Sequence, residues 1–440
     1  MLFDILLTVS DVVETKPLAE QNVYRGYSLL SIIDSSHLST FVIALVLIIY
    51  GSFRALDHDK SKESISSNKF LSDSLSNDQG TNSHVIEAMH AIALPLGASL
   101  SLIIMFFFFD SLQTIFIMCT ASTNSHVIEA MHAIALPLGA SLSLIIMFFF
   151  FDSLQTIFIM CTAILSTMGF AYLLTPCCQL ILRPCSDNTK ISFGFMGRYT
   201  LSEIIAFSLS IALVLVWIIT GHWLFMDVIA TGLCISFIAL VRLPNLKVSA
   251  LLLLGLVIYD VFWVYFSHYI FTTNVMVRVA TREAENPLTT IARKFNFHRY
   301  NAPRLSLPGK IVFPSMQQSG RFSLLGLGDI IMPGLVLCFV LRFESRKRTN
   351  NLYNNDPLAL INRLTYFQCS LFGYCAGLIA ATISAEVFKC AQPALLFLVP
   401  FTLIPLLLIA HLKGDLNSMW SDPFAENGEI PSPSCKLLNV

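Results

Sequence analysis

Long apolar stretches are the feature that most constrains how this chain can fold. A helix needs about 20 mostly apolar residues to cross a bilayer, where its backbone groups must bond to one another. Ten candidate stretches are present, at 38–54, 91–109, 133–151, 153–175, 200–220, 223–242, 246–270, 322–343, 365–388 and 392–411. Charged residues make up only 12% of the chain, about half the share in a soluble domain. The sequence therefore predicts an all-α, multi-pass membrane protein.

One of these stretches belongs to an exact tandem repeat. Residues 81–121 recur letter for letter at 123–163, with Ser122 between the two copies. Perfect identity favours a recent exon duplication or a gene-prediction error over an old, diverged repeat. One extra full crossing would invert all later helices, so we expect the first copy to be re-entrant, on the membrane surface or absent from the natural protein. The expected fold is nine transmembrane helices plus one duplicated helix segment.

Basic residues between the stretches predict how the chain is oriented. Lys and Arg gather in the short loops at 54–69, 183–198, 242–247 and 342–363, whereas the opposite short loops hold only Lys389. The positive-inside rule then places the N-terminus in the lumen and the C-terminus in the cytosol. The basic loop 272–321 falls on the lumenal side and is an exception, and it is long enough to weaken the rule.

Two aspartates interrupt the apolar stretches. Asp260 lies in "VIYDVFWVYF" and Asp329 in "GLGDIIMPGL". A charged side chain at mid-membrane costs about 2.5–3.5 kcal/mol on insertion scales, so it marks a candidate functional site. The two predicted helices are consecutive and antiparallel, and each aspartate lies about 10–15 Å from the same end of its helix. If the helices pack side by side, the two carboxylates face each other and share one proton, as in aspartic proteases.

Spacing alone leaves two classes of function open. Aspartates on neighbouring helices also occur in cation transporters, and a lone intramembrane aspartate is often a structural hydrogen-bonding group. Gly326 and Gly328 fit catalysis, because residues without a Cβ atom let a substrate strand approach Asp329 closely. A non-proteolytic transporter or scaffold that uses the same aspartate pair stays as open at this point as a protease.

Three motifs, in a fixed order, resemble the signatures of a known family. "YD" at 259–260, "GLGD" at 326–329 and "QPALLFLVP" at 392–400 resemble those of the GxGD intramembrane aspartyl proteases, the presenilin and signal peptide peptidase family. Longer stretches, such as "RLPNLKVS" and "IYDVFWVYFSHYIF", most resemble the signal peptide peptidase-like 3 branch. The resemblance covers residues 38–425 apart from the duplicated copy, and it implies nine transmembrane helices.

The resemblance also implies a reaction and a set of site residues. Asp260 and Asp329 would be the catalytic pair of an aspartic endopeptidase. Its substrates would be type II single-pass membrane proteins, among them glycan-modifying enzymes, cut within or near their membrane span in the Golgi or endoplasmic reticulum. The residues expected to bind substrate or support the site are Tyr259, Gly326, Leu327, Gly328, Gln392, Pro393, Ala394 and Leu395. Independently of the resemblance, Pro393 lacks an N–H and disrupts the start of a helix.

No metal ion or cofactor is expected. The 11 cysteines form no CxxC pair and no Cys/His ligand spacing. A net charge of −1 argues against a nucleic-acid surface. The expected partners are therefore the lipid bilayer and membrane-protein substrates, and assembly into a homo-oligomer is left open.

Two further sequence features, a carboxylate and a β-type segment, lie outside the three motifs. Asp227 lies near the start of a predicted span, where a helix-start or packing role is favoured over a third catalytic carboxylate. The segment "SLPGKIVFP" has β-type residues after a Pro-Gly turn and predicts a strand. This strand is hypothesised to lie near the active site and pair with substrate, and an ordinary surface loop is an equally good reading.

The chain is expected to divide into four regions. Residues 1–80 would form a lumenal N-terminus, the first helix and a polar linker typical of disorder, followed by the duplication at 81–163. Residues 164–411 would form the membrane protease core, with its catalytic helices at 246–270 and 322–343. Residues 412–440 are polar, contain Pro and Ser, and predict a disordered cytosolic tail.

Overall fold

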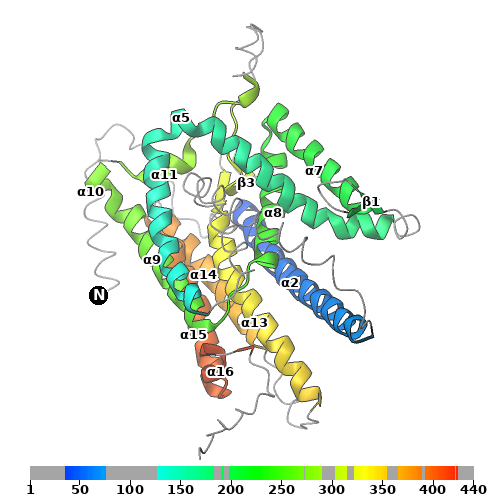
Figure 1. Cartoon of the computed structure of the whole chain (residues 1–440). Coiled ribbons are helices and arrows are strands. Elements are labelled where there is room, and N and C mark those ends of the chain that lie inside the picture. Colours follow the sequence, from blue (N-terminus) through cyan, green and yellow to red (C-terminus); the bar gives the residue numbers. More distant parts are fainter. Residues whose placement is uncertain are drawn as a thin grey trace, which may run out of the picture.

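The computed structural model describes most of the chain beyond the first copy of the repeat. The described residues are 35–75, 126–182, 190–192, 198–271, 273–289, 303–314, 322–353, 365–388, 392–421 and 423–424. Within them the chain is mainly helical (Figure 1), which confirms the predicted all-α, multi-pass class. The stretch 91–109, the first copy of the repeat and most of the tail lie outside the described residues.

The helices follow the chain with short strands between some of them. The long helices are α2 (Ser35–Leu75), α5 (His126–Ile181), α7 (Leu201–Thr220), α8 (Trp223–Leu240), α9 (Leu246–Val261), α13 (Leu327–Tyr353), α14 (Tyr366–Phe388) and α15 (Leu395–Leu412). The shorter elements are the π-helix η3 (Phe262–Phe266), α10 (Ser267–Phe271), α11 (Val275–Thr281) and α16 (Leu416–Trp420). Two antiparallel hairpins pair β1 (Lys190–Ser192) with β2 (Arg198–Thr200) and β3 (Lys310–Pro314) with β4 (Phe322–Gly326).

Seven helical segments in the described part of the chain are long and apolar enough to cross a membrane. The second repeat copy contributes a shorter apolar segment, Leu136–Asp152, to the bent helix α5 (Figure 1). Helix α13 is not among the seven, since its first two-thirds include Asp329, Arg342 and Glu344. The predicted number of nine transmembrane helices therefore stays a prediction.

The described elements differ from the predicted ones in five places. The predicted spans 133–151 and 153–175 form one continuous helix, α5, because the single residue between them, Asp152, does not end the helix. The predicted disordered tail 412–440 begins with an ordered helix, α16.

Three further differences concern two predicted helices and the polar linker. The predicted helix 322–343 begins at Leu327, and its first five residues form strand β4 instead. The predicted helix 246–270 is not a regular α-helix throughout, because residues 262–266 form a π-helical turn. The polar linker is not without structure as far as Leu75, since α2 continues to that residue. Apolar composition marks a buried segment but does not by itself separate a short strand from a helix.

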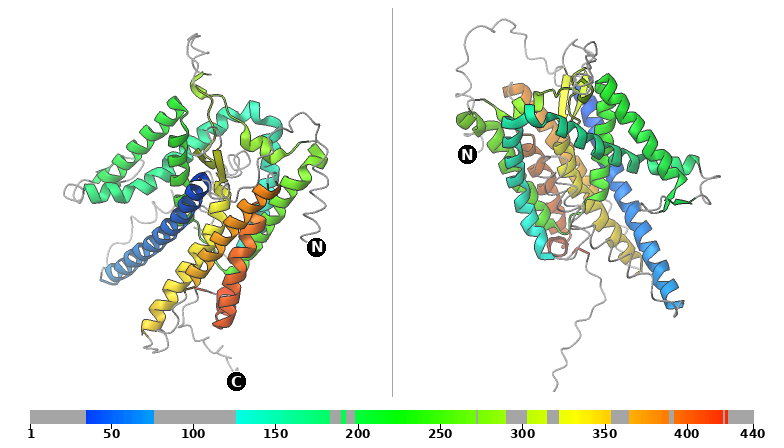
Figure 2. Two further views of the ribbon diagram at one scale, coloured as in Figure 1. Left: turned by 180° about the vertical axis from the view of Figure 1, so that it is seen from behind. Right: turned by 45° about the horizontal axis from the view of Figure 1, so that its top comes forward.

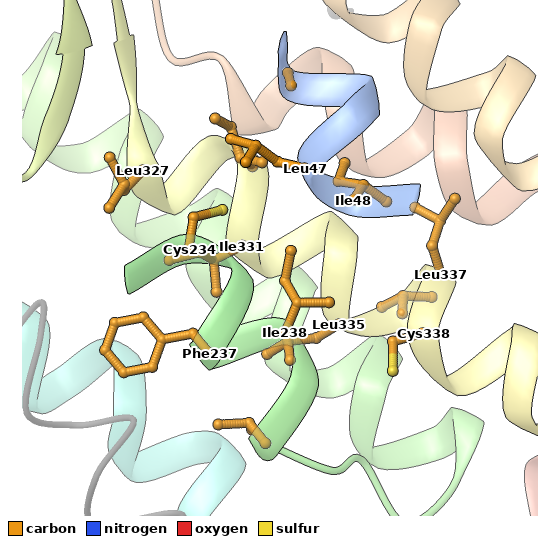
Figure 3. Close-up of a cluster of buried hydrophobic side chains, with 14 of the residues drawn as sticks. Leu47, Ile48, Cys234, Phe237, Ile238, Leu327, Ile331, Leu335, Leu337 and Cys338 are labelled. Carbon is orange, nitrogen blue, oxygen red and sulfur yellow. The ribbon is translucent and has the colours of Figure 1, made fainter. Parts of the chain in front are cut away.

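The core lies where α2, α8 and α13 meet (Figure 3). Ile48 of α2, Ile238 of α8 and Ile331 of α13 belong to one cluster of buried side chains. Cys234 and Cys338 are part of the same cluster, where they act as small hydrophobic residues. This cluster joins the first helix of the described chain to the helix that begins with the "GLGD" motif.

Helices α14 and α15 pack closely on one side of α13 (Figure 2). A Cβ atom placed at Gly373 of α14 would clash with the carbonyl oxygen of Phe401, so this helix pair needs a glycine there. Gly377 follows four residues later, and this small-xxx-small spacing lets two membrane helices bring their backbones together. Close packing of α14 against α15 fixes where the start of α15 lies.

Ion pairs tie the helices together at the end of the bundle opposite the β3–β4 hairpin. Asp59 of α2 pairs with Arg242, which follows α8, and accepts a 2.6 Å hydrogen bond from Arg342 Nε of α13. Asp415 in turn pairs with Lys347 and accepts a hydrogen bond from the Tyr366 hydroxyl. These contacts hold α2, α13 and α15 to one another beyond their apolar parts.

Candidate active site

Asp260 lies on α9 and is bound by the backbone of another helix. Its side chain is 3% exposed, and its Oδ2 atom accepts a 3.2 Å hydrogen bond from the N–H of Leu395. Leu395 is the first residue of α15. The first N–H groups of a helix have no partner within the helix, and the helix dipole makes that end favourable for a carboxylate. The third motif therefore contacts the first one directly.

Pro393 and Ala394 explain why this N–H is available. Pro393 is buried and lies just before the helix, and the carbonyls of Pro393 and Ala394 accept bonds from residues after Leu395. Because proline cannot continue a helix backward, α15 starts at Leu395 and leaves that N–H facing Asp260. The disrupted helix start that Pro393 predicts is confirmed, since α15 begins at Leu395.

Gln392 is held by a residue that the sequence analysis did not single out. The hydroxyl of Tyr265 donates a 2.5 Å hydrogen bond to Oε1 of Gln392. Tyr265 belongs to the π-helical turn η3, which begins two residues after Asp260. Such turns often occur at functional sites. No local sequence signal marks this turn, although the aromatic run "FWVYF" next to Asp260 is unusual in composition.

Asp329 lies where a strand passes into a helix. Strand β4 ends at Gly326, α13 begins at Leu327, and Asp329 is the third residue of that helix. The Asp329 side chain is half-buried and folds back over Gly326, where an added Cβ atom would lie 3.0 Å from Oδ2. Gly328 is exposed, and a Cβ atom there would meet nothing within 4 Å. The missing Cβ atom at Gly326 thus leaves room for the Asp329 carboxylate, and the space beside Gly328 is open.

Tyr374 of α14 supports the backbone at Asp329. Its side chain is 0% exposed, and its hydroxyl donates a 3.3 Å hydrogen bond to the carbonyl oxygen of Asp329. A tyrosine hydroxyl usually finds a partner when it is buried. No local sequence signal distinguishes Tyr374 from the other aromatic residues, because the contact joins residues 45 positions apart.

The β3–β4 hairpin directly precedes helix α13 in the chain and is hydrogen-bonded to its first residue. Lys310 lies opposite Gly326 in the antiparallel pair, and the N–H of Leu327 donates a 3.0 Å hydrogen bond to the carbonyl of Gly309. The strand predicted from "SLPGKIVFP" is confirmed by β3. Its pairing with substrate stays a hypothesis.

The sequence-predicted residues gather at the contact of α9, α13 and α15. Asp260 and Leu395 are joined by a hydrogen bond, and Tyr259 lies half-buried next to Asp260. Leu327 is buried, and Gln392 and Ala394 are half-buried at the start of α15. The predicted face-to-face contact of the Asp260 and Asp329 carboxylates stays a prediction, although their helices α9 and α13 do contact each other.

Comparison with known proteins assigns the family. A model of the signal peptide peptidase family matches residues 120–426, well over half of the chain. The chain belongs to the signal peptide peptidase family. A protein named signal peptide peptidase-like 1, from Arabidopsis thaliana, is 35% identical over 91% of this chain and 96% of its own length. Intramembrane protease 2 of Caenorhabditis elegans is 31% identical over 53% of this chain and 44% of its own length.

The family assignment confirms the resemblance seen in the three motifs, and the chain is an intramembrane protease. The names differ from the predicted branch. A rice protein named signal peptide peptidase-like 3 is 29% identical over 55% of this chain, whereas the relative named signal peptide peptidase-like 1 matches at higher identity over most of it. The family match begins at residue 120, so it contains the whole second copy of the repeat and only the last two residues of the first.

Proposed function

We propose that this intramembrane protease is an aspartic endopeptidase of the GxGD type, with Asp260 and Asp329 as its catalytic pair. Its substrates are type II single-pass membrane proteins, cut within or near their membrane span. The single observation that carries the proposal is the hydrogen bond from the Leu395 N–H to Asp260 Oδ2. It brings the third motif onto the first, while the second motif places Asp329 on the adjoining helix α13.

The reaction needs one proton shared by the two carboxylates. The ionised carboxylate takes a proton from a water molecule, and the resulting hydroxide attacks the scissile carbonyl carbon. The protonated carboxylate gives its proton to the carbonyl oxygen, which yields a tetrahedral diol. Collapse of the diol breaks the C–N bond, and the leaving amine receives a proton from the pair. No metal ion or cofactor takes part in these steps.

The residues around the pair have separate roles in this proposal. The Leu395 N–H binds one oxygen of Asp260 and thereby fixes the orientation of the whole carboxylate, including its other oxygen. Tyr265 holds Gln392 at the end of the segment that leads into α15. The open space at Gly328 receives the substrate backbone next to Asp329. A substrate helix must unwind before its peptide bond can reach the pair, since helical backbone groups are already bonded to one another.

Strand β4 offers an edge to the unwound substrate. Among the described residues its sheet has only two strands, so the edge of β4 away from β3 has no strand partner there, and Leu324 in the middle of β4 is 54% exposed. An extended peptide gains main-chain hydrogen bonds when it adds to such an edge. This edge leads directly to Gly326 and Asp329, so a strand that pairs with it runs toward the catalytic pair.

The proposal includes a location and an orientation for the protein. The basic loops favour a lumenal N-terminus and a cytosolic C-terminus, and the resemblance favours Golgi and endoplasmic reticulum membranes. The ion pairs of Asp59 and Asp415 lie among those basic residues and would then face the cytosol. Glycan-modifying enzymes of the same membranes have the required type II orientation, and they are the substrate class to test first.

The proposed function is tested with purified protein in lipid vesicles together with a type II substrate. The Asp260→Asn and Asp329→Asn variants keep the side-chain shape and remove the proton chemistry. Each should reduce cleavage by about 10³-fold or more, measured by mass spectrometry of the products. Asp152→Asn is the matched control, because Asp152 is exposed on α5 and is outside the site. Wild-type cleavage by either catalytic variant would overturn the aspartic mechanism.

A further inference from the structure

A carboxylate outside the catalytic pair contacts the hairpin that precedes Asp329. Asp227 of α8 is 5% exposed, and its Oδ1 atom accepts a 3.1 Å hydrogen bond from the N–H of Val312 in β3. Its second oxygen, Oδ2, is buried and has no hydrogen-bond partner among the described residues. Burial of a partly satisfied carboxylate is costly, so this position needs an explanation beyond packing.

The register of the hairpin shows which edge Asp227 occupies. The Leu327 N–H bonds to the Gly309 carbonyl, so Gly309 and Leu327 form a hydrogen-bonded pair at the end of the ladder. Pairs alternate along an antiparallel ladder, so Val312 and Leu324 belong to a pair that exchanges no hydrogen bonds. The Val312 N–H therefore points away from β4, toward α8. Asp227 occupies the outer edge of β3 and leaves the outer edge of β4 to other partners.

Because the hairpin is continuous with α13, the contact that holds β3 also holds the backbone at Asp329. β3 is bonded to β4, and β4 leads without a break into the first turn of α13, which carries Asp329. The Asp329 carboxylate also lies against Gly326, the last residue of β4. A displacement of β3 would therefore move the backbone on which Asp329 is mounted.

We propose that Asp227 is a positioning residue, which holds the outer edge of β3 against α8 and thereby fixes the β4–α13 junction at Asp329. The inference rests on the proposed function, because it assigns Asp227 a role in placing one member of the catalytic pair. Asp227 acts as a hydrogen-bond acceptor for Val312, and it neither contacts substrate nor transfers a proton.

Two substitutions at residue 227 show whether Asp227 only accepts a hydrogen bond or also transfers a proton. Asp227→Asn keeps a carbonyl oxygen that accepts from the Val312 N–H, so its kcat should stay within about threefold of wild type. Asp227→Ala removes the acceptor and should lower kcat by about tenfold to a hundredfold, with a smaller effect on KM, because misplacement of a reacting group is costly. Cleavage of the vesicle-reconstituted type II substrate provides both constants.

The donor is removed separately by Val312→Pro. The Val312 N–H is outside the β3–β4 ladder, and a proline already occupies the next position of the same kind, Pro314. Val312→Pro should therefore resemble Asp227→Ala, and the double variant should be no worse than either single one, since both remove the same bond. Asp152→Asn serves again as the carboxylate control.

Hydrogen–deuterium exchange provides a readout that does not depend on cleavage. In Asp227→Ala, amides of 310–314 and 322–326 should exchange faster, whereas those of α9 and α15 should match wild type. Three results would overturn the positioning role: full kcat in Asp227→Ala, additive losses in the double variant, or Asp227→Asn as inactive as Asp227→Ala with unchanged hairpin exchange. If Val312→Pro does not fold, the Ala and Asn variants decide alone. Activity that survives in Asp260→Asn or Asp329→Asn would instead contradict the proposed function, and the exchange result would still decide how the hairpin is held.

Discussion

The two aspartates of the site are held in different ways. Asp260 lies within a helix, is almost fully buried, and is bound by the backbone N–H of Leu395 at the start of another helix. Asp329 lies at a junction of strand and helix, is half-buried, and rests over Gly326. One side of the site is therefore built from packed helices, and the other depends on a hairpin whose edge Asp227 holds. Asp260 is therefore fixed by helix packing, whereas the position of Asp329 depends on how the hairpin is held.

Among variants that keep both carboxylates, the largest effects should come from lengthening each of them by one methylene. Asp260→Glu and Asp329→Glu should both reduce cleavage by about a hundredfold, because a misplacement of about 1 Å is costly in catalysis. Their stabilities should differ. Asp260→Glu overpacks a buried site and should destabilise the protein by about 1–3 kcal/mol, whereas Asp329→Glu should be close to wild type. Thermal unfolding in detergent measures both stabilities, and equal destabilisation by the two variants would mean that the two aspartates are held alike.

Pro393→Ala tests the helix-built side of the site. Alanine lets α15 extend backward, so that the Leu395 N–H gains a partner within its own helix instead of Asp260. Cleavage should fall by about tenfold, in keeping with the loss of a hydrogen bond to a charged group. The kcat in reconstituted vesicles measures the effect. Pro405→Ala is the matched control, since Pro405 lies inside α15 and away from its start. An equal loss in both variants would assign the effect to general helix stability.

Gly326→Ala and Gly328→Ala form a matched pair on the hairpin side. A Cβ atom at residue 326 would lie 3.0 Å from Asp329 Oδ2, so this variant should displace the carboxylate and lower kcat by a few fold. A Cβ atom at residue 328 meets nothing within 4 Å in the protein, so it should leave stability unchanged and interfere with substrate, which raises KM. The split between kcat and KM checks the pair. A purely kcat effect at residue 328 would mean that its open space is not where substrate lies.

The smallest effect is expected from removing 81–122, the first copy of the repeat with Ser122. Both sides of the site are built from residues after 222, and the family match begins at residue 120. The shortened protein should insert into membranes and cleave substrate as well as the full chain or better. Loss of insertion after this deletion would mean that the first copy is a structural element and that the predicted nine-helix topology is wrong.

The positions of helices were the part of the structure most accessible from sequence. The predicted spans 223–242 and 365–388 agree closely with α8 (Trp223–Leu240) and α14 (Tyr366–Phe388), because a membrane span leaves a long apolar run bounded by polar residues. The start of α15 could be predicted as well, because a proline lacks the N–H and clashes with the preceding turn, so a helix does not extend backward past it. Family motifs supplied the aspartates, and their helices do contact each other.

Contacts between distant segments were not accessible in the same way. Strand β4 is mostly apolar, with Ser323 as its one polar residue, and only its pairing with β3 makes it a strand rather than the first turn of a helix. The bonds of Asp227 to Val312 and of Tyr374 to Asp329 join residues 85 and 45 positions apart. Such bonds depend on how the helices pack, and neither partner carries a local signal of the other.

Binding of a transition-state mimic measures whether Asp260 and Asp329 act on the peptide as one pair. A peptide mimic with a hydroxyl group in place of the scissile bond needs one acidic and one basic carboxylate. Calorimetry in lipid nanodiscs would compare wild type, Asp260→Asn and Asp329→Asn over a range of pH. Wild type should bind the mimic with a bell-shaped dependence on pH, and both variants should lose at least about a hundredfold in affinity. Equal, pH-independent binding in all three proteins would contradict it.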